Sequence, residues 1–109
     1  MLLKENPVRS KPLRESARDA QCTLRLPGHC NADPSTSVLC HLPFGGRGVG
    51  TKASDDHAVI GCSGCHDAMD SRALLQISQA ELYECMVRAM AETNALWRAQ
   101  GLVQYKGAK

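Results

Sequence analysis

Two cysteines and one histidine stand together in the sequence CSGCH at residues 62–66. Two thiolates that are separated by two residues, at a turn entering a helix, can bind one Zn²⁺ ion. The positive end of the helix macrodipole also favours their negative charge. Because a structural zinc site is tetrahedral, we expect two further ligands from elsewhere in the chain.

Cys22 and Cys30 are the first candidates for the second pair of zinc ligands. The turn signal Pro27-Gly28 lies between them and can fold the chain back, so that the two thiols meet. Seven residues separate the two cysteines, where about two to four are usual, and His29 is an alternative ligand. The sequence therefore predicts a structural zinc ion bound by Cys22, Cys30, Cys62 and Cys65.

The pattern CxxCH is also the attachment signature of c-type haem, which requires export to an oxidising compartment. The N-terminal sequence MLLKENPVRS lacks the apolar stretch of a secretory signal, so we expect a cytoplasmic protein without haem. Cytosolic cysteines stay reduced, which favours metal binding over disulfides. A thiol redox protein using Cys62 and Cys65 would need a βαβ context, which the pattern does not show. No run of about 20 apolar residues is present, so we expect no membrane span.

The chain has 109 residues, which is the size of one domain with a thin hydrophobic core. It contains six cysteines but only four aromatic residues, so we expect metal binding to supplement apolar packing. The formal net charge of +2 permits a nucleic-acid partner without identifying one.

Residues 1–20 mix basic and acidic side chains with two prolines and show no sustained period, which predicts a mobile or loosely docked arm. Residues 21–109 then form a single domain. Its first part is rich in Gly, Pro, Asp and Ser and contains short β-type runs at 23–26, 36–41 and 58–60. This pattern predicts small strands joined by loops.

A helical pattern begins after Cys65 and extends to about residue 76. Ser78 and Glu81 then form a capping box, which predicts a second helix over about 79–100, with Gly101 as its stop. Whether its apolar face packs on the domain's own core or on a second copy stays open, so the oligomeric state is unknown. That face consists of Leu82, Cys85, Met86, Ala89, Met90, Thr93, Leu96 and Trp97.

The segment CHLPFGGRGVGTKASDDHAVIGCSGCHDAMD, residues 40–70, resembles HNH endonucleases of the ββα-metal type. In that family a histidine ends the first strand, a Gly-rich loop follows, and CxxCH opens the helix. More narrowly, nearly the whole chain resembles the prophage-encoded nucleases of the YbcO family. The resemblance implies an α+β fold, with a zinc-stapled ββα-metal (HNH-like) core at residues 22–76 followed by a C-terminal helix.

The resemblance also implies roles for individual residues. His41 matches the general base that activates water, and His66 matches a ligand of a catalytic divalent ion, which would be Mg²⁺, Mn²⁺ or Zn²⁺. His57 stands where the motif usually has asparagine, a residue that braces the loop or joins the metal. Cys40 occupies a position where the family usually has an aspartate or histidine as a metal ligand.

Cys40 limits the choice of the catalytic metal ion. Mg²⁺ prefers oxygen ligands, whereas Zn²⁺ and other transition ions tolerate a thiolate. Three outcomes therefore stay open. The catalytic ion is softer than Mg²⁺; or Cys40 turns away and Asp55, Asp56 or His57 completes the metal shell; or the site is inactive.

We expect a metal-dependent endonuclease of phage type that hydrolyses phosphodiester bonds in DNA. Histidine titrates near neutral pH and can accept a proton from water, while the metal ion stabilises charge on the phosphate. Arg47, Lys52 and Arg72 would hold the nucleic-acid backbone. The alternative is a non-catalytic, zinc-stapled module that binds nucleic acid or a protein partner.

Overall fold

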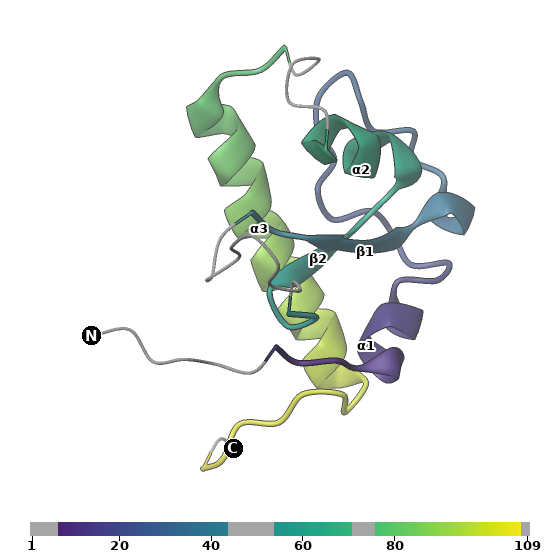
Figure 1. Cartoon of the computed structure of the whole chain (residues 1–109), viewed down its shortest axis with the longest axis vertical. Coiled ribbons are helices and arrows are strands. Elements are labelled where there is room, and N and C mark those ends of the chain that lie inside the picture. Colours follow the sequence, from purple (N-terminus) through teal and green to yellow (C-terminus); the bar gives the residue numbers. More distant parts are fainter. Residues whose placement is uncertain (1–6, 44–53, 71–75, 108–109) are drawn as a thin grey trace.

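The computed structural model describes residues 7–43, 54–70 and 76–107 of the chain. Helices pack around a two-stranded antiparallel sheet, so the fold is a small α+β domain (Figure 1). In chain order the described elements are α1 (Lys11–Ser16), the 3₁₀ helix η1 (Pro34–Thr36), β1 (Val38–His41), β2 (Ala58–Gly61), α2 (Ser63–Asp70) and α3 (Gln79–Ala99).

The register of the sheet places neighbouring side chains of β1 in two different cores. Cys40 pairs with Val59, and His41 pairs with Ala58. Side chains point alternately to the two faces of a sheet. Cys40 and Val59 therefore belong to a core that also contains the thiols of the CxxC motif. Ala58 belongs to a second core, which contains Trp97 and residues of α1. It follows that the Cys40 and His41 side chains leave opposite faces of the sheet.

Helix α3 packs against β2 and begins at the predicted capping box (Figure 1). The Ser78 hydroxyl accepts a hydrogen bond from the Glu81 N–H at 3.1 Å, and Gly101 follows the helix with a φ of 72°, as predicted. Most of the predicted apolar face lies in the domain's own core. Its buried residues are Leu82, Cys85, Met86, Ala89, Thr93 and Trp97. None of the helices that the structure describes is long and apolar enough to cross a membrane.

Thr93 connects α3 to the open edge of β2. Its hydroxyl accepts the Ile60 N–H at 3.2 Å and lies 3.3 Å from the Thr23 hydroxyl. Thr23 in turn donates its N–H and its hydroxyl to the Ile60 carbonyl, at 2.8 and 2.6 Å. A two-stranded sheet is marginally stable by itself, and an unpaired strand edge leaves backbone groups without partners. These bonds supply partners for that edge and make α3 part of the core.

Residues 7–20 differ from the mobile or loosely docked arm that the sequence predicts. They contain helix α1, in which the Ser10 hydroxyl accepts the Leu13 N–H at 3.2 Å as the N-cap. Leu13 and Ala17 are buried in the second core, and the Trp97 indole N–H donates to Ser16 Oγ at 2.8 Å. Two buried side chains are too few to produce a visible helical period, so the docking of this segment does not show in the sequence.

The run Thr23–Leu26 is not a strand, although its residue types favour one. Arg25 has a φ of 45°, which interrupts an extended backbone. The N–H groups of Arg25 and Leu26 donate to the sulfur atoms of Cys22 and Cys65, each at 3.4 Å. Thr23 bonds to β2, but the cysteine sulfur atoms determine the path of the backbone at Arg25 and Leu26.

Candidate active site and metal centre

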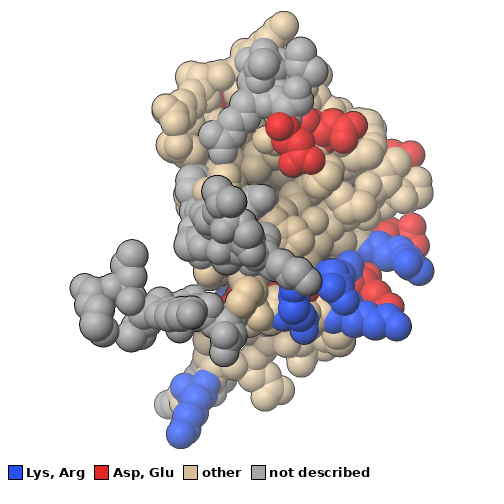
Figure 2. Space-filling view, viewed as in Figure 1, with Lys and Arg blue, Asp and Glu red and all other residues tan. Residues whose placement is uncertain are grey.

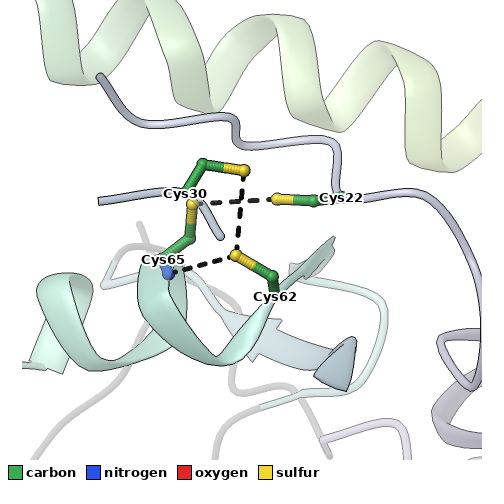
Figure 3. A group of neighbouring side chains, drawn as sticks. All are labelled: Cys22, Cys30, Cys62 and Cys65. Atoms are coloured by element: carbon green, nitrogen blue, oxygen red, sulfur yellow. Dashed lines mark hydrogen bonds between the residues drawn. The ribbon is translucent and has the colours of Figure 1, made fainter. Parts of the chain in front are cut away.

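The four cysteines predicted to bind zinc come together around one point (Figure 3). All four Sγ atoms lie within 4.8 Å of one another, with Cys22 and Cys65 3.7 Å apart and Cys30 and Cys62 3.8 Å apart. Four sulfur ligands at the usual Zn–S distance of about 2.3 Å form a tetrahedron with edges of about 3.8 Å. The group therefore fits a metal ion such as Zn²⁺.

Two local structures position these thiols. Cys62 precedes α2 and Cys65 lies in its first turn, so one end of the helix supplies two sulfur atoms. The other pair flanks a turn in which Gly28 has a φ of 77° and the Cys30 N–H donates to the Leu26 carbonyl at 3.0 Å. This is the turn that Pro27-Gly28 predicts, and it brings Cys22 and Cys30 together. His29, the alternative ligand, is not a member of the group.

Backbone N–H groups point at the sulfur atoms. The Asn31 N–H and the Cys65 N–H both donate to Cys62 Sγ at 3.4 Å. Burial opposes ionisation of Cys62, but these two N–H groups together with the Cys65 side chain lower its pKa. The hydrogen bond that Cys22 and Cys65 share lowers the pKa of Cys22 and raises that of Cys65. Because zinc binds thiolates, this arrangement is prepared for a cation.

Cys40 lies apart from the four-cysteine group and faces the core. It is 1% exposed, and its thiol donates to the Val38 carbonyl at 3.7 Å. A Cβ atom added to Gly61 would lie 2.8 Å from Cys40 Sγ, so glycine leaves the room for this thiol. Burial raises the pKa of Cys40 to about 12. The thiol is therefore neutral near pH 7 and closed to solvent, which matches the alternative in which Cys40 turns away from a catalytic ion.

His41 and Asp55 form a hydrogen-bonded pair at the end of β1. His41 Nε2 lies 2.9 Å from Asp55 Oδ1, and the Asp55 side chain is fully buried while that of His41 is 27% exposed. The Ser10 N–H donates to Asp55 Oδ2 at 2.7 Å, and Arg14 Nη1 lies 3.8 Å from the same oxygen. Burial opposes ionisation of Asp55, but the Ser10 N–H, His41 and Arg14 together lower its pKa.

The ionised Asp55 carboxylate determines the tautomer of His41. A carboxylate can only accept hydrogen bonds, so the Nε2 atom of His41 must carry the proton in this pair. In the neutral ring the lone pair is then on Nδ1. The partly exposed His41 ring then has a proton acceptor, Nδ1, that the Asp55 carboxylate does not engage. Sequence reasoning assigned Asp55 to a metal shell and missed this contact, because the partners are far apart along the chain.

The other two histidines of the predicted site occupy different places. His57 is half-buried, and its carbonyl accepts the Leu42 N–H at 2.9 Å, one step beyond the end of the sheet. His66 lies on α2 with its side chain 39% exposed, and its Nδ1 is 3.8 Å from Asp70 Oδ2. Within the described ranges no hydrogen bond joins His66 to His41, and the thiols are the one group of three or more clustered metal-ligand residues. The predicted DNA contacts lie outside the residues that the structure describes; they are Arg47, Lys52 and Arg72.

Comparison with known proteins gives a match over most of the chain. The family model described as "Putative nuclease YbcO" matches residues 11–102. The chain belongs to the YbcO family. One curated relative, "Putative nuclease YbcO" of Escherichia coli K12, is 41% identical over 93 residues, which cover 84% of this chain and 96% of the relative. The protein of the same name from Enterobacteria phage 82 has the same identity and coverage.

A solved structure extends the YbcO match to three dimensions. The structure of "a putative bacteriophage protein from Escherichia coli str. K-12 substr. MG1655" superposes with a TM-score of 0.67 and 37% identity. It covers 83% of this chain and 100% of the solved chain. The YbcO family match starts at the first residue of α1 and ends beyond α3, so both helices belong to the shared fold. Membership of the YbcO family suggests nuclease function.

Proposed function

We propose that the protein is a metal-dependent endonuclease that hydrolyses phosphodiester bonds in DNA, with His41 as its general base. Membership of a nuclease family supports hydrolysis of nucleic acid. The observation that carries the assignment of the base is the buried, ionised Asp55 bound to the partly exposed His41. A proton acceptor held in one tautomer at the end of a strand is what activation of water requires.

The order of the elements supports an HNH-like, ββα-metal unit. Strands β1 and β2 are followed directly by α2, and the predicted base ends the first strand while the CxxC thiols open the helix. In this proposal the four thiols bind a structural Zn²⁺ ion. That ion fixes α2 and the loop that carries Cys22 in a domain whose aromatic core is small.

Hydrolysis begins with a water molecule near His41 Nδ1. A phosphodiester repels hydroxide, so the reaction needs a base that removes the proton from water as it attacks phosphorus. His41 accepts that proton and becomes a cation, and the Asp55 carboxylate at 2.9 Å stabilises it. At an effective dielectric constant of about 20, a charge pair at this separation gains about 4 to 6 kcal/mol before desolvation is counted.

A second divalent ion, Mg²⁺, Mn²⁺ or Zn²⁺, would supply positive charge at the phosphate and at the leaving oxygen. The resemblance to HNH enzymes assigns His66 to this ion, with His57 close by in the sequence motif. A single partly exposed protein ligand suits such an ion, because Mg²⁺ keeps waters and takes phosphate oxygens as its other ligands. Arg47, Lys52 and Arg72 remain predicted contacts to the DNA backbone.

Nicking of supercoiled plasmid by the zinc-loaded protein tests this proposal, in Mg²⁺, Mn²⁺, Ni²⁺ and Zn²⁺ in turn. We expect at least one ion to support nicking and His41→Gln to abolish it. The glutamine amide can still donate to Asp55, so zinc content and thermal unfolding should stay close to the parent's values. Equal nicking by parent and variant would contradict the assignment of the base. DNA binding without cleavage in all four ions would favour a non-catalytic module.

A further inference from the structure

The N-terminal segment is fastened to the loop that carries Asp55. The Val8 N–H donates to Ser54 Oγ at 2.8 Å, and the Asp55 N–H donates to the Val8 carbonyl at 2.9 Å. The Ser10 N–H binds the Asp55 carboxylate itself at 2.7 Å. These three bonds, together with buried Leu13, fix the start of α1 beside the His41–Asp55 pair.

Arg14 is the cationic side chain that this docking brings to the pair. Its Nη1 lies 3.8 Å from Asp55 Oδ2, close enough for charge attraction but too far for a hydrogen bond. Among the described residues its guanidinium donates no hydrogen bond, and the side chain is 49% exposed. The N–H groups of Arg14 therefore have capacity for a further acceptor on the solvent side.

The surroundings of Arg14 are basic. Lys11 lies on α1 three residues before Arg14 and is 3.8 Å from Glu15, and Arg18 lies in the turn that follows the helix; both basic side chains are exposed. In Figure 2 a group of Lys and Arg atoms lies over α1 with some Asp and Glu atoms among them, and a separate group of Asp and Glu atoms lies over α2. An anionic chain that approaches His41 would meet positive charge on the α1 side of the pair.

The charge of Asp55 makes such a cation useful. A carboxylate that holds the base also repels the phosphate that the base must approach. Arg14 and His41 occupy the two oxygens of the same carboxylate, so Arg14 offsets this repulsion at the point where it acts. A guanidinium also presents planar, paired N–H donors that match two oxygens of a phosphate.

We propose that Arg14 binds a backbone phosphate of the nucleic acid next to the bond that His41 acts on. This inference rests on the proposed nuclease function and adds the docked N-terminal segment to its binding surface. It assigns a phosphodiester contact to a residue outside positions 47–72, where the sequence places the basic contacts.

Binding of a short fluorescein-labelled DNA duplex tests the role of Arg14. Both Arg14→Gln and Arg18→Gln would be made in zinc-loaded His41→Gln protein, and no catalytic ion would be added, so that the DNA is not cut during the measurement. Fluorescence anisotropy over a range of salt concentrations would then compare the DNA affinities of the two variants. Loss of one phosphate contact should make the slope of log association constant against log salt concentration less negative by about 0.9. Near 0.1 M salt, this corresponds to binding that is about eightfold weaker. Arg18→Gln removes the same charge from the turn that follows α1, and it should weaken binding less.

The outcomes separate this inference from the nuclease proposal. Equal weakening by Arg14→Gln and Arg18→Gln, or none, would overturn the phosphate contact while parent nicking activity still supports the nuclease. Selective weakening by Arg14→Gln together with no cleavage by the parent protein would support the contact and contradict the nuclease. Arg14→Lys keeps the charge without the paired donors, so it should restore the salt slope but only part of the affinity. Absence of DNA binding by the parent protein would overturn both.

Discussion

Replacing Asp55 by asparagine removes one negative charge from a fully buried side chain and leaves its size nearly unchanged. The carboxylate accepts from His41 Nε2–H on one oxygen and from the Ser10 N–H on the other, with Arg14 beside the second oxygen. Asparagine has a single oxygen acceptor and an NH₂ donor. In either orientation of the amide, one donor therefore faces another unless a proton moves.

The two orientations differ in cost. If the NH₂ group faces the Ser10 N–H, a buried backbone donor is left unpaired, at about 1 to 3 kcal/mol. If the NH₂ group faces His41, the ring can adapt by moving its proton from Nε2 to Nδ1, so that Nε2 accepts. The second orientation is expected to win, because histidine can change its tautomer and a backbone N–H cannot change. The Nδ1 lone pair that removes the proton from water is then lost.

Cleavage by Asp55→Asn should fall by about 10² to 10⁴, the usual contribution of a general base. Loss of the charge-assisted hydrogen bonds should lower the free energy of unfolding by about 2 kcal/mol. Because the folded-state pKa of Asp55 is lowered, its ionised form stabilises the fold, fully so above the unfolded pKa of about 4. The stability difference between parent and variant should therefore be largest above about pH 5 and should shrink as pH falls through the folded-state pKa.

Single-turnover nicking and urea unfolding at several pH values measure these effects. Asp19→Asn is the matched control, because Asp19 is exposed and has a φ of 61°, a conformation that asparagine adopts readily. The control should change neither the cleavage rate nor the pH dependence of unfolding. Cleavage by Asp55→Asn at the parent rate would refute the tautomer argument. A stability difference that stays constant down to pH 3 would refute the ionisation of Asp55.

Three further predictions concern the cysteines and α2. Zinc removal by a chelator, or Cys62→Ser, should unfold the domain, since structural zinc binding is part of the folding free energy. Metal analysis together with circular dichroism would show the loss of zinc and of folded structure. A folded, zinc-free protein would contradict this prediction. Gly64→Ala gains about 1 kcal/mol in helix propensity but drives its Cβ into the His29 carbonyl oxygen. Urea unfolding should therefore show a net loss of about 1 to 3 kcal/mol in the free energy of unfolding. An unchanged unfolding midpoint would count against this packing. Burial raises the pKa of Cys40 to about 12, so at about pH 8 iodoacetamide should modify Cys40 only after the protein unfolds. Peptide mass spectra would measure the labelling. Rapid labelling of Cys40 in the native protein would contradict its burial.

Local signals explain the parts of the fold that the sequence predicts well. The capping box at Ser78 and the glycine at residue 101 set the bounds of α3, because both act within one helical turn. The turn at Pro27-Gly28 brings Cys22 to Cys30 in the same way. Strand β1 starts at Val38 and not at residue 36, because the Asp33 side chain caps the 3₁₀ helix η1 just before it.

Contacts between distant residues explain what the sequence does not predict. Asp55 is 45 residues from Ser10 and 14 residues from His41, so no local spacing identifies these three as neighbours. Helix α1 depends on Trp97, 81 residues after Ser16. The predicted strand at 23–26 is absent because only Thr23 bonds to β2, while the N–H groups of Arg25 and Leu26 bind sulfur. For Asp55, α1 and Leu26, the deciding partner lies in another part of the chain.

Imidazole rescue of His41→Ala tests the role of His41 as the general base. The variant removes the base and leaves a gap beside Asp55 that free imidazole can enter, donating to the carboxylate as His41 does. Plasmid nicking by the zinc-loaded variant would be followed at rising imidazole concentration. A separate binding measurement would check that the variant binds DNA as the parent protein does. We predict that nicking is lost in the variant and returns in proportion to imidazole. Nicking by His41→Ala at the parent rate without imidazole would contradict this role of His41.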